Sequence, residues 1–151
     1  MIWKPNVTVA VVVEQDGKYL LVEEEPETGR GLFLNQPAGH LDPGESIVQG
    51  AVRETLEETG YTFEPEYVLG VYQWHSHRAD TTYLRFAFGG RVTHHDPKRK
   101  LDTGILRASW FGFDEVNQTI QRHRSPLVMQ CIRDHLAGKR YPLELMLHYE
   151  S

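Results

Sequence analysis

The hydrophobic pattern at the start of the chain is that of two β-strands. Val7–Val13 is a run of mostly β-branched residues, and Lys18–Glu24 is a second segment of the same kind. Asp16-Gly17, between them, is typical of a two-residue hairpin turn. The stretch that follows, Pro26–Gly44, contains several Gly and Pro residues and is interpreted as a long irregular loop.

The spacing of apolar residues then changes to that of a helix. Ser46 and Gln49 stand three residues apart, as in a capping box, and Gly60 is a natural C-terminal stop. The apolar stripe between them consists of Ile47, Val48, Ala51, Val52 and Leu56. This pattern predicts a helix that opens at Ser46 and packs one face against the core.

Three more strands and one more helix complete the pattern. The strands are expected at Tyr67–Trp74, Tyr83–Val92 and Leu106–Phe111. The helix is expected over Pro126–Ala137, because Ser125-Pro126 suits its start and Gly138 its end. Elements in this order predict an α/β fold, a mixed β-sheet with helices packed on its faces. Since no repeat or domain break is visible, residues 1–151 are expected to form a single domain.

The composition limits the kinds of partner. A net charge of −5 argues against a nucleic-acid polymer or an anionic membrane surface, and the longest apolar stretch is far too short to span a bilayer. The single Cys131 excludes an internal disulfide and, with no signal peptide visible, favours a cytoplasmic location. A small phosphorylated substrate remains compatible with the charge when a metal ion supplies the positive charge. A monomer and a homodimer both stay open.

Three carboxylates gather near the end of the first helix. Glu54, Glu57 and Glu58 stand three and four residues apart, where like charges repel by roughly 0.2–0.5 kcal/mol per pair. None of them has a Lys or Arg four residues later, and the helix dipole is negative at this end. A solvated acidic face is one interpretation. A divalent cation, Mg²⁺ with Mn²⁺ as a substitute, is the other, because coordination would turn the repulsion into binding.

The segment around these acids is similar to a known motif. Residues 39–61 read GHLDPGESIVQGAVRETLEETGY and resemble the Nudix box, G-x5-E-x7-R-E-U-x-E-E-x-G-U, with U an aliphatic residue. The fixed positions are matched by Gly39, Glu45, Arg53, Glu54, Glu57, Glu58 and Gly60. Thr55 and Tyr61 stand where aliphatic residues are expected, and by its angle on the helix Thr55 should face the core. Further segments, from Trp3 to Glu144, look like the bacterial NudJ group of Nudix hydrolases.

This resemblance implies a Nudix-type α/β/α sandwich and Mg²⁺-dependent hydrolysis of phosphoanhydrides. NudJ-like enzymes look like phosphatases of nucleoside tri- and diphosphates and of hydroxymethylpyrimidine diphosphate. The metal would be held by Glu54, Glu57 and Glu58, with the carbonyl of Ala38 or Gly39 as a further ligand. Glu54 is the first candidate for the base. Arg53 is expected to lock a carboxylate in place, and Glu45 either assists the metal or pairs with Arg53.

Residues outside the motif are candidates for substrate contacts. Lys4, Arg30 and Arg85 could bind phosphate, with simple solvation as the alternative for Arg30. Trp74 and Tyr72 could stack on a base or pyrimidine ring, or belong to the core. His75 and His77 could hold a second metal, although exposed polar histidines are the simpler interpretation. Asp96–Asp102 is interpreted as a charged loop that could cover the site.

Two other functions remain open from the sequence. A nucleotide-sugar or dinucleotide pyrophosphatase would share the whole box and differ outside it. A non-catalytic nucleotide-binding module would usually lack one or more of the box acids, all of which are present here.

Overall fold

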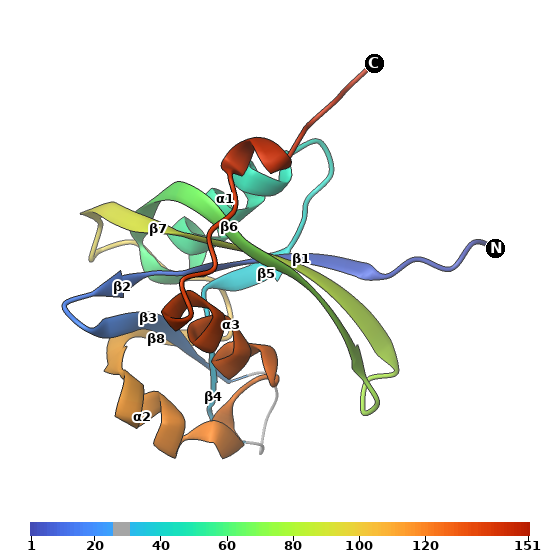
Figure 1. Cartoon of the computed structure of the whole chain (residues 1–151). Helices are drawn as coiled ribbons and strands as arrows, with labels where there is room; N and C mark the ends of the chain where they lie inside the picture. The colour runs from blue at the N-terminus through green and yellow to red at the C-terminus, as the bar shows by residue number, and fades with distance from the viewer. Residues whose placement is uncertain (26–30) are drawn as a thin grey trace.

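The computed structural model describes residues 1–25 and 31–151 (Figure 1). Its strands are β1 Asn6–Val12, β2 Glu14–Gln15, β3 Lys18–Glu24, β4 Phe33–Asn35, β5 Ala38–His40, β6 Tyr61–Ser76, β7 Thr81–His95 and β8 Ile105–Gly112. Its helices are α1 Ile47–Thr59, α2 Phe113–Gln118 and α3 Leu127–Leu136, with short 3-10 turns η1 Ile120–Arg122 and η2 Leu143–Leu145.

Two sheets form the centre of the molecule. The first has the order β5-β1-β7-β6, in which β1 and β7 run parallel and the other neighbours run antiparallel. The second is built on β3, which pairs with β2, β4 and β8. The mixed sheet that the sequence predicted is therefore confirmed.

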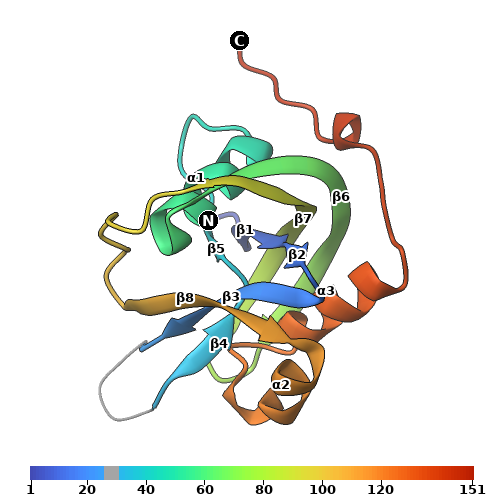
Figure 2. The ribbon, with the colours of Figure 1, turned by 90° about the vertical axis from the view of Figure 1, so that its left-hand side faces the viewer.

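The helices cover both faces of the first sheet because its strands alternate their side chains. On β1, Val9 and Val11 belong to the apolar cluster that contains Ala51 of α1. Val12 points to the other face, into the cluster that contains Ile132 of α3. Figure 2 shows α1 and α3 on opposite sides of β1 and β7. This arrangement is the expected α/β/α sandwich.

The first helix has the predicted ends. Ser46 and Gln49 form the reciprocal capping box, and Gly60 takes the left-handed conformation at φ 75°, which costs a residue without a side chain little. Thr55 is fully buried, as predicted, and its hydroxyl donates to the carbonyl of Ala51 at 2.8 Å. The polar group at this aliphatic position is thus satisfied within the helix.

Some elements differ from the sequence prediction. The stretch predicted as one loop, Pro26–Gly44, contains β4 and β5 within its described part, and α2 was not predicted. β6 begins at Tyr61 rather than at Tyr67, directly after the helix ends. Its register against β7 shifts at several points, among them the step past Pro65, so the alternation that marks a strand is broken there. Within the described residues, no helix is both long and apolar enough to cross a membrane.

Candidate active site

Arg53 organises the acids of α1. Its Nε and Nη2 donate to the two carboxylate oxygens of Glu45 at 2.9 and 2.7 Å. Its Nη1 donates to Glu54 at 2.9 Å and to Glu57 at 2.6 Å, and its Nη2 also donates to the carbonyl of His40 at 2.9 Å. A planar guanidinium that makes several charge-assisted hydrogen bonds fixes the positions of its partners. The repulsion expected from the sequence is thus relieved from the preceding turn, since Arg53 stands four residues before Glu57.

Two of the helix acids are buried. Glu58 accepts a hydrogen bond from the backbone N–H of Ala38 at 2.9 Å, yet burial raises the pKa of its carboxyl to about 9. Burial likewise raises the pKa of Glu54 to about 7, against the opposing effect of Arg53. By contrast, the hydrogen bonds from Arg53 lower the pKa of Glu45. Folding therefore places two carboxylates where their charged forms lack solvation, which is typical of a site that binds a cation.

Gly39 leaves room for Glu54. The position that a Cβ would take on Gly39 lies 2.2 Å from Cδ of Glu54, so any side chain there would displace the carboxyl group. Gly39 and Ala38 lie on β5 and line the same cleft as Glu54 and Glu58. Their predicted role as carbonyl ligands stays a prediction.

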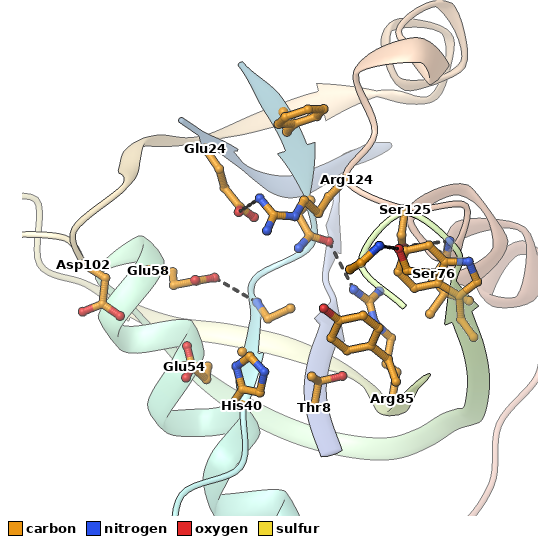
Figure 3. Close-up of a pocket in the computed structure, with 18 of the residues that line it drawn as sticks. Thr8, Glu24, His40, Glu54, Glu58, Ser76, Arg85, Asp102, Arg124 and Ser125 are labelled. Atoms are coloured by element: carbon orange, nitrogen blue, oxygen red, sulfur yellow. Dashed lines mark hydrogen bonds and ion pairs between the residues drawn. The ribbon is translucent and has the colours of Figure 1, made fainter. Parts of the chain in front are cut away.

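A fourth acid comes from outside the motif. Asp102, which precedes β8, places a carboxylate oxygen within 4.8 Å of those of Glu54 and Glu57, and the three could hold a metal ion together. Figure 3 shows Asp102 on the same side of the cleft as Glu54 and Glu58. Its backbone N–H donates to the carbonyl of Glu57 at 3.0 Å. In the sequence Asp102 is only the end of a charged loop, because nothing in its spacing relates it to a helix far earlier in the chain.

Three of these acids, Glu54, Glu58 and Asp102, line a cleft of about 740 Å³. The same cleft is lined by Trp74 and Tyr83, whose rings stack with centroids 5.5 Å apart. Arg85 also lines it, buried at the base, where it donates to Gln36 at 3.0 Å and to Asn35 at 3.2 Å. Trp74 and Arg85, predicted as substrate contacts, therefore lie in the same cleft as the acids. Tyr83 was missed, as were two further arginines, Arg78 and Arg124, that line the cleft.

Other predicted contacts lie elsewhere. Tyr72 does not line this cleft: its hydroxyl donates to Asp134 of α3 at 2.6 Å. The strand period puts Tyr72 on the same face as Trp74, but α3 covers that part of the face. Lys4 is exposed in the segment before β1 and is not among the residues of the cleft. Arg30 lies outside the described residues.

Among the described residues, the histidines of the β6–β7 hairpin are not part of a group of ligands that could hold a second metal ion. His75 and His77 are both exposed, and the His75 ring contacts Thr82 at 3.1 Å and Asp80 at 3.5 Å. In the described part of the chain, the only group of three or more potential ligands close enough to share an ion is Glu54, Glu57 and Asp102. The simpler interpretation, exposed polar histidines, fits this geometry.

Comparison with known proteins agrees with the fold and identifies the family. The NUDIX domain model matches residues 3–131, and the chain belongs to the Nudix hydrolase family. It is 41% identical over 144 residues to phosphatase NudJ of Escherichia coli (strain K12), which covers 95% of this chain and 92% of that protein. It is thus a hydrolase that acts on phosphoanhydrides.

Solved structures give the same result. A NUDIX hydrolase from Nitrosomonas europaea superimposes with a TM-score of 0.94 at 61% identity, over 97% of this chain and 98% of the other. A UDP-X diphosphatase superimposes with a TM-score of 0.72 at 20% identity, over 94% of this chain and 68% of that one, and shows the shared fold alone.

Proposed function

We propose that the protein is a Mg²⁺-dependent phosphatase that removes the terminal phosphate from nucleoside tri- and diphosphates and from hydroxymethylpyrimidine diphosphate. The observation that carries this proposal is a group of three carboxylates within 4.8 Å of one another, on Glu54, Glu57 and Asp102. Glu54 and Asp102 line a cleft that arginines and stacked aromatic rings also line. The relation to a protein named phosphatase NudJ supports the choice of reaction.

The donor set fits a hard divalent cation. Carboxylate oxygens are the ligands that Mg²⁺ and Mn²⁺ prefer, and burial of Glu54 without a full set of partners leaves its pKa raised. Glu54, Glu57 and Asp102 would hold the ion, with Glu58 and the carbonyls of Ala38 and Gly39 as further candidates. When bound, the cation supplies positive charge that neutralises the diphosphate and its leaving group.

The protein's own residues orient the reaction. Arg53 fixes Glu45, Glu54 and Glu57 in one array, so these carboxylates need no rearrangement when the substrate arrives. Glu54 is the proposed base, because its carboxylate lines the cleft beside Asp102, where an attacking water and the diphosphate would meet. Glu45, whose pKa is lowered, stays charged and holds Arg53 in place.

The rest of the cleft suits the organic part of the substrate. Trp74 and Tyr83 form an aromatic wall on which a base or pyrimidine ring can stack. Arg85 supplies a buried positive charge at the base of the cleft, oriented by Asn35 and Gln36. A substrate that reaches from the acids to this wall would have its diphosphate at the acid end.

The test is a substrate panel with products measured separately. We expect orthophosphate from nucleoside triphosphates, with the diphosphate visible as an intermediate, and orthophosphate from hydroxymethylpyrimidine diphosphate. Activity should vanish with chelator and return with Mg²⁺ or Mn²⁺. Full turnover in chelator would overturn the proposal.

The competing function is a nucleotide-sugar or dinucleotide pyrophosphatase, which would share the whole Nudix box and differ outside it. Such an enzyme would release a nucleoside monophosphate from a nucleotide sugar or dinucleotide. Release of pyrophosphate from a triphosphate, with no diphosphate intermediate, would likewise contradict the phosphatase assignment.

A further inference from the structure

Glu24 and Arg124 face each other on the wall of the cleft above the acids (Figure 3). Nη1 of Arg124 stands 3.5 Å from Oε2 of Glu24. The Glu24 side chain is only 16% exposed, whereas that of Arg124 is 45% exposed. Both residues line the cleft. The pair therefore joins a largely buried carboxylate to a guanidinium that substrate can reach.

The contact is weak compared with the other arginine contacts of the site. Charge-assisted hydrogen bonds to carboxylates are usually 2.7–2.9 Å long. Arg53 makes several in that range, and Arg85 is buried and held by two side-chain amides. At 3.5 Å and with only one oxygen contacted, Arg124 gains much less from Glu24. Another anion can consequently take over its guanidinium at small cost.

The backbone of Arg124 is held by a short hydrogen bond, whereas its side chain makes only long contacts. Its N–H donates to the carbonyl of Leu34 in β4 at 2.8 Å, next to a bridge between His123 and Leu34. The guanidinium lies 5.9 Å from the ring centroid of Phe33, also in the cleft wall. A fixed backbone and an adaptable side chain suit a residue that moves from one partner to another.

We propose that Arg124 binds a phosphate of the substrate after leaving Glu24, so that Glu24 competes with the substrate for this arginine. This exchange rests on the proposed function, and through it Glu24 and Arg124 together set the affinity for the diphosphate group. A phosphate group offers more charge and more acceptor oxygens than a single carboxylate contact. The exchange costs the Glu24 contact, and Glu24 therefore weakens substrate binding.

Two single variants should change affinity in opposite directions. The probe is α,β-methylene-ADP, whose bridge resists hydrolysis, titrated calorimetrically in the presence of Mg²⁺. Arg124→Gln should weaken binding roughly tenfold or more, because a charge-assisted hydrogen bond is lost. Glu24→Gln should strengthen binding by about threefold, because the competing charge is removed while the side-chain size is kept.

The double variant and a matched control complete the design. In Glu24→Gln with Arg124→Gln, affinity should equal that of Arg124→Gln alone, since there is no arginine left to compete for. Arg91→Gln removes an arginine from an exposed ion pair with Glu64, on residues that do not line the cleft, and should leave binding unchanged. Melting curves for each variant, with Arg124→Lys as a second replacement, check that the fold is kept.

The outcomes separate this inference from the proposed function. Unchanged binding by Arg124→Gln and Arg124→Lys, or weaker binding by Glu24→Gln, in an enzyme that hydrolyses diphosphates would overturn the exchange alone. Binding of the analogue with the predicted opposite effects, in a protein that hydrolyses no diphosphate, would support the exchange and overturn the proposed function. Failure of the wild-type protein to bind the analogue at all would overturn both.

Discussion

Arg53 holds Glu45 through both carboxylate oxygens, at 2.9 and 2.7 Å, and this two-point contact needs a planar fork. A lysine at this position would keep the positive charge but could not make the two-point contact with Glu45. Arg53→Lys should lower the free energy of unfolding by about 1–3 kcal/mol, since several partly buried acceptors lose their donors. Turnover should also fall at least tenfold, because Glu54 and Glu57 lose their common partner. Chemical denaturation and rate assays measure both, with Arg91→Lys in an exposed pair as the control.

Glu58→Gln should separate stability from catalysis. The buried carboxyl has its pKa raised to about 9, so near pH 7 an amide replaces a mostly neutral group. The amide oxygen can still accept from the N–H of Ala38. Metal-free stability should therefore stay equal or rise by some tenths of a kcal/mol, whereas turnover should fall on the order of 10²–10³-fold, as when one electrostatic stabiliser is removed.

Glu57→Gln makes a useful comparison. Its carboxylate accepts from Arg53 at 2.6 Å, so removal of the charge also weakens an ion pair. We expect metal-free stability to stay equal or fall slightly, and turnover to fall to a similar extent as in Glu58→Gln. Near-wild-type turnover in both variants would show that these carboxylates do not form the metal site.

Metal-free stability should fall as pH rises from about 4.5 to 9. The pKa of Glu54 is raised to about 7 and that of Glu58 to about 9, from an ordinary value of 4.5. The folded state thus binds more protons than the unfolded state in this interval. The contribution of the two carboxyls to the free energy of unfolding is fully present below pH 4.5 and is lost as pH passes through the raised pKa values. Mg²⁺ binds the charged carboxylates, so the metal-induced rise in Tm should grow with pH. A Tm shift that is the same at pH 6 and pH 8.5 would contradict this linkage.

Gly39→Ala should disable the site without unfolding the protein. A Cβ at this position would lie 2.2 Å from Cδ of Glu54, so the carboxyl must leave its place in the group with Asp102 and Glu57. Metal affinity, measured by calorimetry, should fall at least tenfold. Gly112→Ala is the matched control, because its Cβ would meet only a side-chain oxygen of Glu115 at 3.5 Å. Unchanged affinity in Gly39→Ala would mean that Glu54 is not a ligand.

Asp102→Asn tests the acid that lies outside the motif. The change removes one negative charge from the group formed with Glu54 and Glu57, while the backbone hydrogen bond to Glu57 is kept. Metal affinity should fall by roughly tenfold. Asp96→Asn, in the same connection but not lining the cleft, should have no such effect. Equal affinities in the two variants would remove Asp102 from the site.

Features that depend on neighbouring residues could be predicted from the sequence. The Asp16-Gly17 turn, the capping box at Ser46 and the stop at Gly60 each follow from local chemistry, and the structure has all three. β4 and β5 are only three residues each, in a segment rich in Gly and Pro, and they exist because β3 and β1 pair with them. Pairing of that kind leaves little periodicity in the sequence.

The same distinction applies to the site. Spacing along one helix predicts that Glu54, Glu57 and Glu58 lie together. The same spacing places Arg53 one turn before Glu57, within reach of these acids. Asp102 reaches them only through the connection between β7 and β8, which no local pattern describes. Strand period also placed Tyr72 and Trp74 on one face correctly, but it does not reveal that α3 covers Tyr72.

The backbone hydrogen bond from Asp102 to Glu57 has a consequence for how the protein assembles. It joins the end of α1 to a point in the chain that follows two long paired strands, so it closes a large loop. A helix can form within microseconds, whereas contacts so distant in sequence wait for the strands between them. During refolding, metal affinity should therefore emerge later than helicity, and binding of the ion would report when this loop has closed.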